Sequence, residues 1–177
     1  MRPKVFLSAS VPLPNRDQRY FETADPIAIR EAVKALVLVS IENEIEIVFG
    51  GHPAITPMIS RTFSQAGLSP RDHVFLYQSE FFLGQFPPSN DEFGSYVITP
   101  SVANSREQSL MLMRRRMICE NHLNAAIFIG GMDGCIEEYE LSAEWRPSVH
   151  RLPIASTGGA SLELFKRFGG DERLATE

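Results

Sequence analysis

The sequence predicts a Rossmann-like three-layer α/β sandwich with a mainly parallel sheet. Apolar runs of strand length alternate with helical patterns along the chain, as they do in parallel α/β proteins. The 177 residues suffice for one domain with a filled core, and the 44% hydrophobic and 22% charged content is ordinary for a globular protein. We therefore expect one domain over residues 1–170 with about five to seven strands, followed by a tail at 171–177.

The first strand is expected at Lys4–Ser8, and a polar loop follows it over Ala9–Asp25. Asp25 is a suitable cap, and Pro26 suits the first turn of a helix that continues to about Ser40. The next expected elements are a strand at Glu46–Phe49, a helix at Ala54–Ala66 that Gly67 ends, and a strand at His73–Tyr77.

The segment Gln78–Gly94 is long and irregular, and loops of this length are usually functional or mobile. Regular alternation resumes after it. The remaining expected elements are a short strand at Tyr96–Thr99, a helix from Ser105 to about His122, a strand at Ala125–Ile129, a helix at Cys135–Trp145, a strand at Arg151–Ala155, and a helix that follows Ser156–Gly159 and ends near Phe168.

Composition excludes several classes of function. The net charge of −5 argues against a general nucleic-acid surface, and no run approaches the ~20 apolar residues of a membrane span. Cys119 and Cys135 are too few for a disulfide framework, and no Cys-x-x-Cys or His-x-x-x-His spacing indicates a metal. The apolar run at the N-terminus is too short for a signal peptide. We expect a cytoplasmic protein with no metal, no cofactor, no nucleic-acid partner and no membrane partner.

Four predicted strands end in small, polar or Gly-rich turns, at Ser8–Ser10, Gly50–His52, Gly130–Gly134 and Ser156–Gly159. Open parallel sheets bind ligands outside the carboxyl ends of their strands, so all four turns should lie at one edge. The G-x-G-x-x-G fingerprint is absent after the first strand, which argues against an ordinary NAD-dependent dehydrogenase. The candidate ligand-binding residues of these turns are Ser8, Ser10, Gly50, Gly51, His52, Gly130, Gly131, Asp133, Gly134, Cys135, Thr157 and Gly158.

The most informative segment is Met113–Leu141, in which an Arg-rich helix precedes a buried strand, a Gly-rich turn and a second helix. This order places free backbone N–H groups at a helix N-terminus, which is a ready phosphate site. A basic cluster in an acidic protein suits a small anionic ligand better than a long polyanion. Because neighbours on a helix point about 100° apart, Arg114, Arg115 and Arg116 cannot all face one pocket, and we assign Arg114 to it.

The same segment resembles the signature of the Lonely Guy (LOG) phosphoribohydrolases, which belong to the wider SLOG superfamily. That signature is M-x-x-R-K-x-x-M on a helix and P-G-G-x-G-T-x-x-E after the next strand. The matching positions are Arg114 and Arg115 on the helix, with Met117 one residue before the place of the signature's last Met, and Gly130, Gly131, Gly134, Glu137 and Glu138 after the strand. The resemblance implies that Arg114 and Glu138 occupy the catalytic Arg and Glu positions of the family.

Three differences reshape the turn. Ile129 replaces the family's Pro, Met132-Asp133 replaces a single residue, and Cys135 replaces the Thr. These differences favour ligand binding over hydrolysis. The resemblance therefore implies two functions. One is a sensor of nucleotide or NAD-derived signals, such as cyclic ADP-ribose isomers, in bacterial defence. The other is an N-glycosidase that releases a base from a nucleoside 5′-monophosphate, with a deoxyribosyltransferase-like activity as a variant.

Plainer roles exist for the same residues. The glycines can serve a tight turn, Glu138 can favour a helix start as Glu137 does, and His52 can be a turn residue rather than a phosphate donor. Ser8 and Ser10 can satisfy loop backbone instead of a ligand.

Partners follow from the two readings. The ligand is a small phosphorylated nucleotide, and a sensor without an effector domain would act by oligomerising or through a partner such as a TIR or sirtuin-type protein. Apolar residues on the Arg-rich helix favour a homo-oligomer, although they can equally pack against the sheet. These residues are Leu110, Met111, Met113 and Met117.

Overall fold

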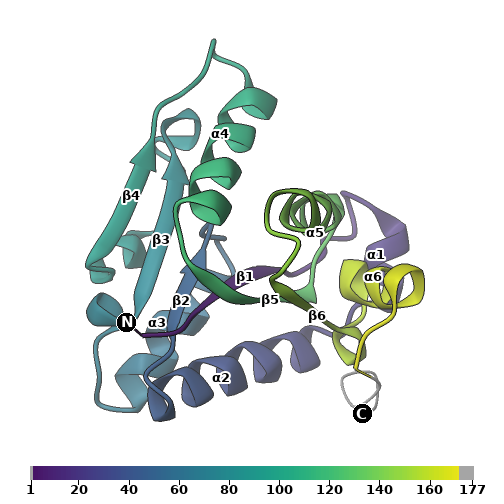
Figure 1. Ribbon diagram of the computed structural model, residues 1–177, viewed down its shortest axis with the longest axis horizontal. Helices are drawn as coiled ribbons and strands as arrows, with labels where there is room; N and C mark the ends of the chain where they lie inside the picture. Colours follow the sequence, from purple (N-terminus) through teal and green to yellow (C-terminus); the bar gives the residue numbers. More distant parts are fainter. Residues whose placement is uncertain (1, 172–177) are drawn as a thin grey trace.

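The computed structural model describes residues 2–171 and contains one six-stranded sheet in the order β4-β3-β2-β1-β5-β6 (Figure 1). Every neighbouring pair of strands is parallel. The predicted Rossmann-like α/β class is therefore confirmed. The strands are β1 (Lys4–Ser10), β2 (Glu46–Phe49), β3 (Val74–Ser79), β4 (Ser95–Thr99), β5 (Leu123–Gly130) and β6 (His150–Ile154).

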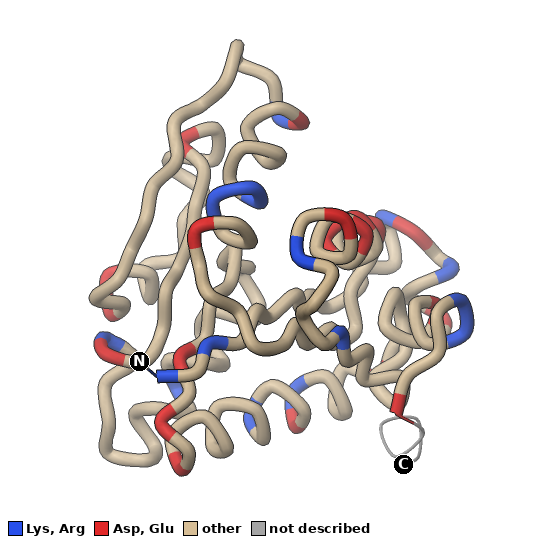
Figure 2. The backbone as a smooth tube through the Cα atoms, viewed as in Figure 1, with Lys and Arg blue, Asp and Glu red and all other residues tan. Residues whose placement is uncertain are grey.

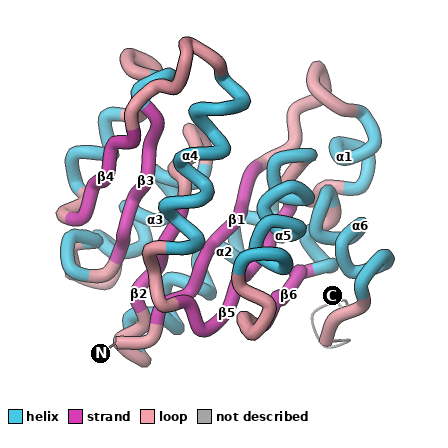
Figure 3. The backbone as a smooth tube through the Cα atoms, turned by 45° about the horizontal axis from the view of Figure 1, so that its top comes forward, coloured by secondary structure: helices cyan, strands magenta, loops and turns pink. Residues whose placement is uncertain are grey.

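Helices cover both faces of the sheet (Figure 3). Helices α2 and α3 pack on one face, and α4, α5 and α6 on the other. The helices are α1 (Gln18–Thr23), α2 (Pro26–Glu42), α3 (Ile55–Gln65), α4 (Arg106–Cys119), α5 (Asp133–Trp145) and α6 (Gly159–Phe168), with short 3-10 turns η1 (Pro70–Asp72), η2 (Glu80–Phe82), η3 (Pro88–Glu92) and η4 (Ala155–Thr157).

The two halves of the core follow from the alternation of side chains along each strand. On β1, Val5 and Leu7 pack against α2 and α3, whereas Phe6 packs with Phe128 of β5 beneath α4 and α5. The rings of Phe6 and Phe128 meet edge to face at 6.2 Å between centroids. The central strands are apolar on both faces, as a parallel sheet requires.

The order of the strands reverses between β1 and β5, and this places the ligand-binding edge. From β1 the chain builds outward through β2, β3 and β4, then crosses back through α4 to β5 on the other side of β1. Ser8 is in register with Phe128, and Ser10 with Gly130. A crevice opens outside the carboxyl ends of strands at such a switch point. The turns after β1 and β5 therefore flank the expected site.

The expected loop Ala9–Asp25 is wrong in two respects. β1 continues to Ser10, and α1 forms at Gln18–Thr23 with Asp17 as its cap. This helix has six residues and buries one side chain, Tyr20, so it lacks the repeating apolar pattern by which a helix is recognised from sequence. The expected tail at 171–177 lies outside the described residues, apart from Asp171.

The second half of the segment Gln78–Gly94 packs on the α3 side of the sheet, whereas η2 in its first half contacts α4. Ser60 of α3 donates a hydrogen bond to Glu92 of η3, and Phe93 lies buried against Phe49 with ring centroids 6.0 Å apart. Two 3-10 turns, η2 and η3, interrupt it. Between β3 and β4 the segment therefore contacts helices on both faces of the sheet.

The apolar residues of α4 serve mainly the core. Met113 and Met117 are buried in the cluster beneath α4 and α5, and Leu110 packs against it. Met111 and Leu112 instead line a surface groove of about 370 Å³ together with Arg115. Most of the surface predicted to join two copies is thus interior packing. Within residues 2–171, no helix is long and apolar enough to cross a membrane.

Arg146, just after α5, joins the ends of α4 and α5. Its guanidinium donates to the carbonyl oxygens of Ile118, Cys119 and Asn121, at 3.2 Å for Ile118 and 3.0 Å for Asn121. The last carbonyls of a helix have no partner within it, and a cation at that end is favoured by the helix dipole. Arg146 therefore fixes α4 against α5 at their C-terminal ends.

Replacing this side chain should destabilise the fold. We expect Arg146→Ala to lower the free energy of unfolding by about 2 kcal/mol, because buried carbonyls lose a charged donor. Urea unfolding followed by circular dichroism measures the change. Arg115→Ala, which truncates an exposed arginine on α4, is the control and should change stability by less than ~0.5 kcal/mol.

Candidate functional site

The turn after β5 is built around two glycines with positive φ, 59° at Gly130 and 88° at Gly131. A Cβ at Gly131 would overlap the side chain of Cys135, and one at Gly130 would lie 2.5 Å from Ile29 Cδ1. Both positions therefore require glycine for conformation and for space. The turn brings the chain from the sheet directly into α5.

The amides of these glycines are already engaged within the protein. Gly130 N–H donates to Thr157 Oγ1 at 2.8 Å, and Gly131 N–H donates to the Ser10 carbonyl at 2.8 Å. Thr157 is 1% exposed and its hydroxyl also donates to the Ile154 carbonyl, so its hydrogen-bonding capacity serves the turn. Gly158 packs against the carbonyl of Thr23. Thr157 and Gly158 thus stabilise the turn.

Backbone N–H groups without a partner among residues 2–171 follow the glycines, at the start of α5. Met132 is the N-cap and makes no side-chain cap hydrogen bond. Among residues 2–171, no hydrogen bond engages the backbone N–H groups of Asp133 or Gly134. Amides at the N-terminus of a helix favour an anion. Asp133 and Gly134, rather than Gly130 and Gly131, therefore supply the available backbone donors.

Arg114 faces this helix start. Its side chain is 8% exposed, and two carboxylates of α5 contact it: Glu137 Oε2 lies 2.6 Å from Nη1, and Glu138 Oε1 lies 3.2 Å from Nε. A Cβ built on Gly134 would be 3.3 Å from Nη2, so the third nitrogen points to the first turn of α5. Figure 2 shows the basic band of α4 beside the acidic helix α5.

The other two arginines of the cluster point elsewhere. Arg115 is exposed, and Arg116 pairs with Glu120 one turn along α4 at 3.0 Å. The three side chains thus diverge as helical geometry requires, and only Arg114 enters the site.

Glu138 also reaches the end of β1. Ser8 Oγ donates to Glu138 Oε2 at 2.6 Å, so a continuous polar chain runs from β1 through Glu138 to Arg114. Ser8 and Ser10 lie beside Cys135, which is 5% exposed. Burial, together with the charge of Glu138, raises the pKa of the Cys135 thiol to about 12, although the two serine hydroxyls oppose that shift. Cys135 is therefore a packed thiol rather than a thiolate nucleophile.

The turn after β2 forms the neighbouring part of the edge. Gly50 lies beneath Met113, and Gly51 lies against Gln78. His52 lies just before α3, whose N-cap is Ala54. Its Nδ1 accepts from Ala54 N–H at 3.2 Å, so its neutral ring carries the proton on Nε2. Burial lowers the pKa of His52 to about 4, and the positive charge of nearby Arg16 adds to this effect. At neutral pH His52 is uncharged, so it can offer a phosphate an N–H but no charge.

Helix α1, which the sequence did not reveal, closes one side of the turn. Tyr20 is 3% exposed, and its hydroxyl donates to Asp133 Oδ1 at 2.8 Å. Burial and this hydrogen bond raise the pKa of Tyr20 above its usual range. Arg19 also approaches Asp133, with Nη2 3.6 Å from Oδ1. Asp133 is thus held by α1, and its expected role in ligand binding would be shared with Tyr20 and Arg19.

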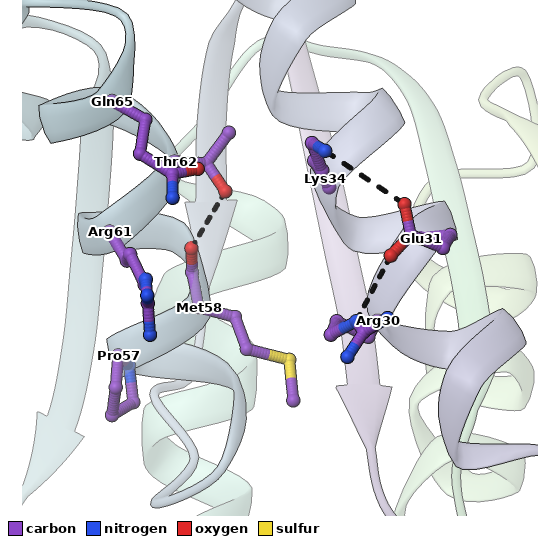
Figure 4. A pocket seen from close by; sticks show the side chains of 8 residues that line it. All are labelled: Arg30, Glu31, Lys34, Pro57, Met58, Arg61, Thr62 and Gln65. Atoms are coloured by element: carbon purple, nitrogen blue, oxygen red, sulfur yellow. Dashed lines mark hydrogen bonds and ion pairs between the residues drawn. The ribbon is translucent and has the colours of Figure 1, made fainter.

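Surface hollows occur elsewhere, so the chemistry rather than the shape identifies the site. A groove of about 470 Å³ separates α2 from α3 on the opposite face of the sheet (Figure 4). Two of its three basic residues, Arg30 and Lys34, are about half exposed and share the carboxylate of Glu31. By contrast, the cation of Arg114 is buried at the switch point between two carboxylates. We therefore place the candidate site at Arg114 and α5.

Comparisons with known proteins show the family and the fold. The model of the SLOG cluster3 family matches residues 19–177, which confirms the resemblance to the SLOG superfamily. The crystal structure of TM1055, a structural-genomics target, superposes with a TM-score of 0.54 at 12% identity, over 93% of this chain and 81% of that chain. This likeness shows the fold. No curated protein matches the sequence.

The buried imidazole should make stability depend on pH. Because the pKa of His52 is about 4 in the folded chain and 6.5 in an unfolded one, the unfolded state binds a proton that the folded state excludes. The stabilisation is present above pH 6.5 and is lost as the pH falls toward 4. Between pH 7 and pH 5 we expect wild type to lose roughly 1–2 kcal/mol more than His52→Gln. His122→Gln, at an exposed position, should behave as wild type in the same urea titrations.

The buried thiol should be chemically silent. In a Cys119→Ser variant, we expect Ellman's reagent to release no colour from the folded protein at pH 8, because Cys135 is both inaccessible and protonated. After unfolding in guanidinium, one equivalent should react. Rapid reaction of the folded variant would contradict the packed position of Cys135.

Proposed function

Because this chain belongs to the SLOG cluster3 family, we propose that it binds a nucleotide or an NAD-derived ligand of the ADP-ribose type at the carboxyl edge of its sheet. Membership of the SLOG family suggests a nucleotide-related function. In this proposal the protein is a sensor module of a bacterial defence or stress system. It passes the signal on by oligomerising or through an effector partner, for which a TIR or sirtuin-type protein is the expected kind.

The phosphate would lie at the first turn of α5. The amides of Asp133 and Gly134 offer hydrogen bonds, and the helix dipole favours negative charge there. Arg114 faces the same turn and supplies the charge that a phosphate requires. His52 and Arg16, near each other across the edge, extend the donors available to a second phosphate.

The ribose would lie beside Glu138. A carboxylate accepts two hydrogen bonds from vicinal hydroxyls, and Ser8, whose hydroxyl donates to Glu138, lies next to it as a further acceptor. The observation that carries the proposal is this buried polar chain from Ser8 through Glu138 to Arg114, located where the strand order reverses. It joins an anion-binding group to a hydroxyl-binding group within one site.

An N-glycosidase is the second candidate, and the contact between Arg114 and Glu138 favours it. Glu138 is ion-paired and only 16% exposed, so a carboxylate is available to stabilise the positive charge that develops when the bond from C1′ to the base breaks. Water would add to C1′, and the base would leave with a proton. The reshaped turn and the protonated, buried Cys135 support binding without cleavage instead.

One assay separates the two candidates. Purified protein is incubated with AMP, dAMP, NAD, ADP-ribose and cyclic ADP-ribose, and the products are followed by chromatography with mass detection. Release of a free base or nicotinamide that Glu138→Gln abolishes would establish an N-glycosidase. Intact ligands that co-elute with the protein would establish a binding module.

Binding should depend on the fork of Arg114 and not on its charge alone. We expect Arg114→Lys to weaken the binding of AMP or ADP-ribose about tenfold or more, because lysine keeps the charge but cannot make two parallel hydrogen bonds. Isothermal titration calorimetry measures the dissociation constant. Arg115→Lys is the matched control on the exposed side of α4 and should leave affinity unchanged.

A further inference from the structure

Two carboxylates contact Arg114, and the two are held very differently. Glu138 is 16% exposed and is fixed a second time by Ser8 at 2.6 Å. Glu137 is 42% exposed, and within residues 2–171 its ion pair with Arg114 at 2.6 Å is the one polar contact of its side chain. Glu137 is therefore the carboxylate that can leave.

The position of Glu137 matters because of the geometry of guanidinium. A phosphate binds an arginine most strongly through two N–H groups that point the same way. On Arg114, Nε faces Glu138, Nη1 faces Glu137, and Nη2 faces the first turn of α5. A phosphate at that turn can reach Nη2 directly, but it can use the fork formed by Nη1 and Nη2 only after Glu137 moves away.

Charge leads to the same conclusion. Arg114 contributes +1, and Glu137 and Glu138 contribute −1 each, so the cluster has a net charge of −1 before any ligand arrives. An incoming phosphate therefore meets a negative site. When Glu137 turns into solvent, the remaining pair of Arg114 and Glu138 is neutral and the fork is open.

Resting on the proposed function, we propose that Glu137 is an internal competitor that a ligand's phosphate displaces from Arg114. The carboxylate holds the buried arginine in place in the absence of ligand and lowers the affinity for phosphate. Glu138 remains paired in both states and holds the ribose. Ligand binding thus converts one ion pair within the protein into one between protein and ligand, and releases a carboxylate at the surface of α5.

Removing the competitor should tighten binding. We expect Glu137→Gln to bind AMP roughly fivefold to tenfold more tightly than wild type, because the phosphate no longer displaces a partly exposed ion pair. Affinity for adenosine, which has no phosphate, should not change. Isothermal titration calorimetry with both compounds measures these constants, and thermal unfolding confirms that each variant is folded.

Glu140→Gln is the matched control. It removes the same charge from the same helix at an exposed position that makes no contact with Arg114 among the described residues. Tighter binding of AMP by Glu137→Gln alone supports the proposal, including the case in which wild type binds too weakly to measure. If wild type binds AMP and Glu137→Gln binds it equally or less well, Glu137 is no competitor, and the proposed function stands. If neither binds AMP or ADP-ribose, both proposals fail.

Discussion

The guanidinium group of Arg114 is buried on a helix that crosses the sheet, and a charge in that position must be paired. Two carboxylates from α5 provide the pairing. Leaving a buried charge with no partner at all is far more costly than a pair is stabilising. The arrangement of α4 against α5 is therefore constrained at both ends, by Arg114 at the N-terminal end of α5 and by Arg146 at the other. The position of the candidate site depends on this constraint.

Hydrogen bonds within the protein also decide which backbone N–H groups remain available to a ligand. The Gly-rich turn after β5 looks like a phosphate cradle, yet Thr157 and Ser10 take up the amides of Gly130 and Gly131. Within residues 2–171 the amides of Asp133 and Gly134 have no such partners, because Met132 makes no side-chain cap hydrogen bond. The glycines of the turn are thus held by hydrogen bonds, whereas the amides that follow them can still bind a ligand. A ligand that binds there would order little backbone, which lowers the entropic cost of binding.

Much of this fold was predictable from local pattern. The alternation of apolar runs and helical segments predicted the parallel sheet, and the Asp25-Pro26 pair predicted the start of α2, where Asp25 accepts from Ile27 N–H at 2.8 Å. The Gly-rich turn and the charged residues around it indicated where the site lies. Periodicity failed at α1, where six residues bury one side chain. Periodicity also did not decide whether Met113 and Met117 of α4 pack in the core or on an oligomer interface.

The roles of single residues were harder to predict, because they depend on partners distant in sequence. Thr157 appeared as a possible ligand contact, but its hydroxyl is consumed by Gly130, 27 residues earlier. Glu137 appeared as an ordinary residue of a helix start, because nothing local reveals that its carboxylate reaches Arg114 on another helix. Tyr20 reaches Asp133 only because α1 packs beside the start of α5. The sequence indicated which edge of the sheet holds the site. The role of each residue at that edge depends on tertiary contacts.

The central strand has a consequence for how the chain is made. β1 pairs with β2 on one side and with β5 on the other, and the register joins Lys4 to Leu123 and Ser10 to Gly130. On a ribosome that adds about 5–20 residues per second, one flank of β1 therefore waits on the order of ten seconds for its neighbour. During that time a strand rich in apolar residues presents unpaired backbone groups, which is the state most prone to wrong association. The bond between Ser8 and Glu138 can form only after that interval, once α5 has been synthesised.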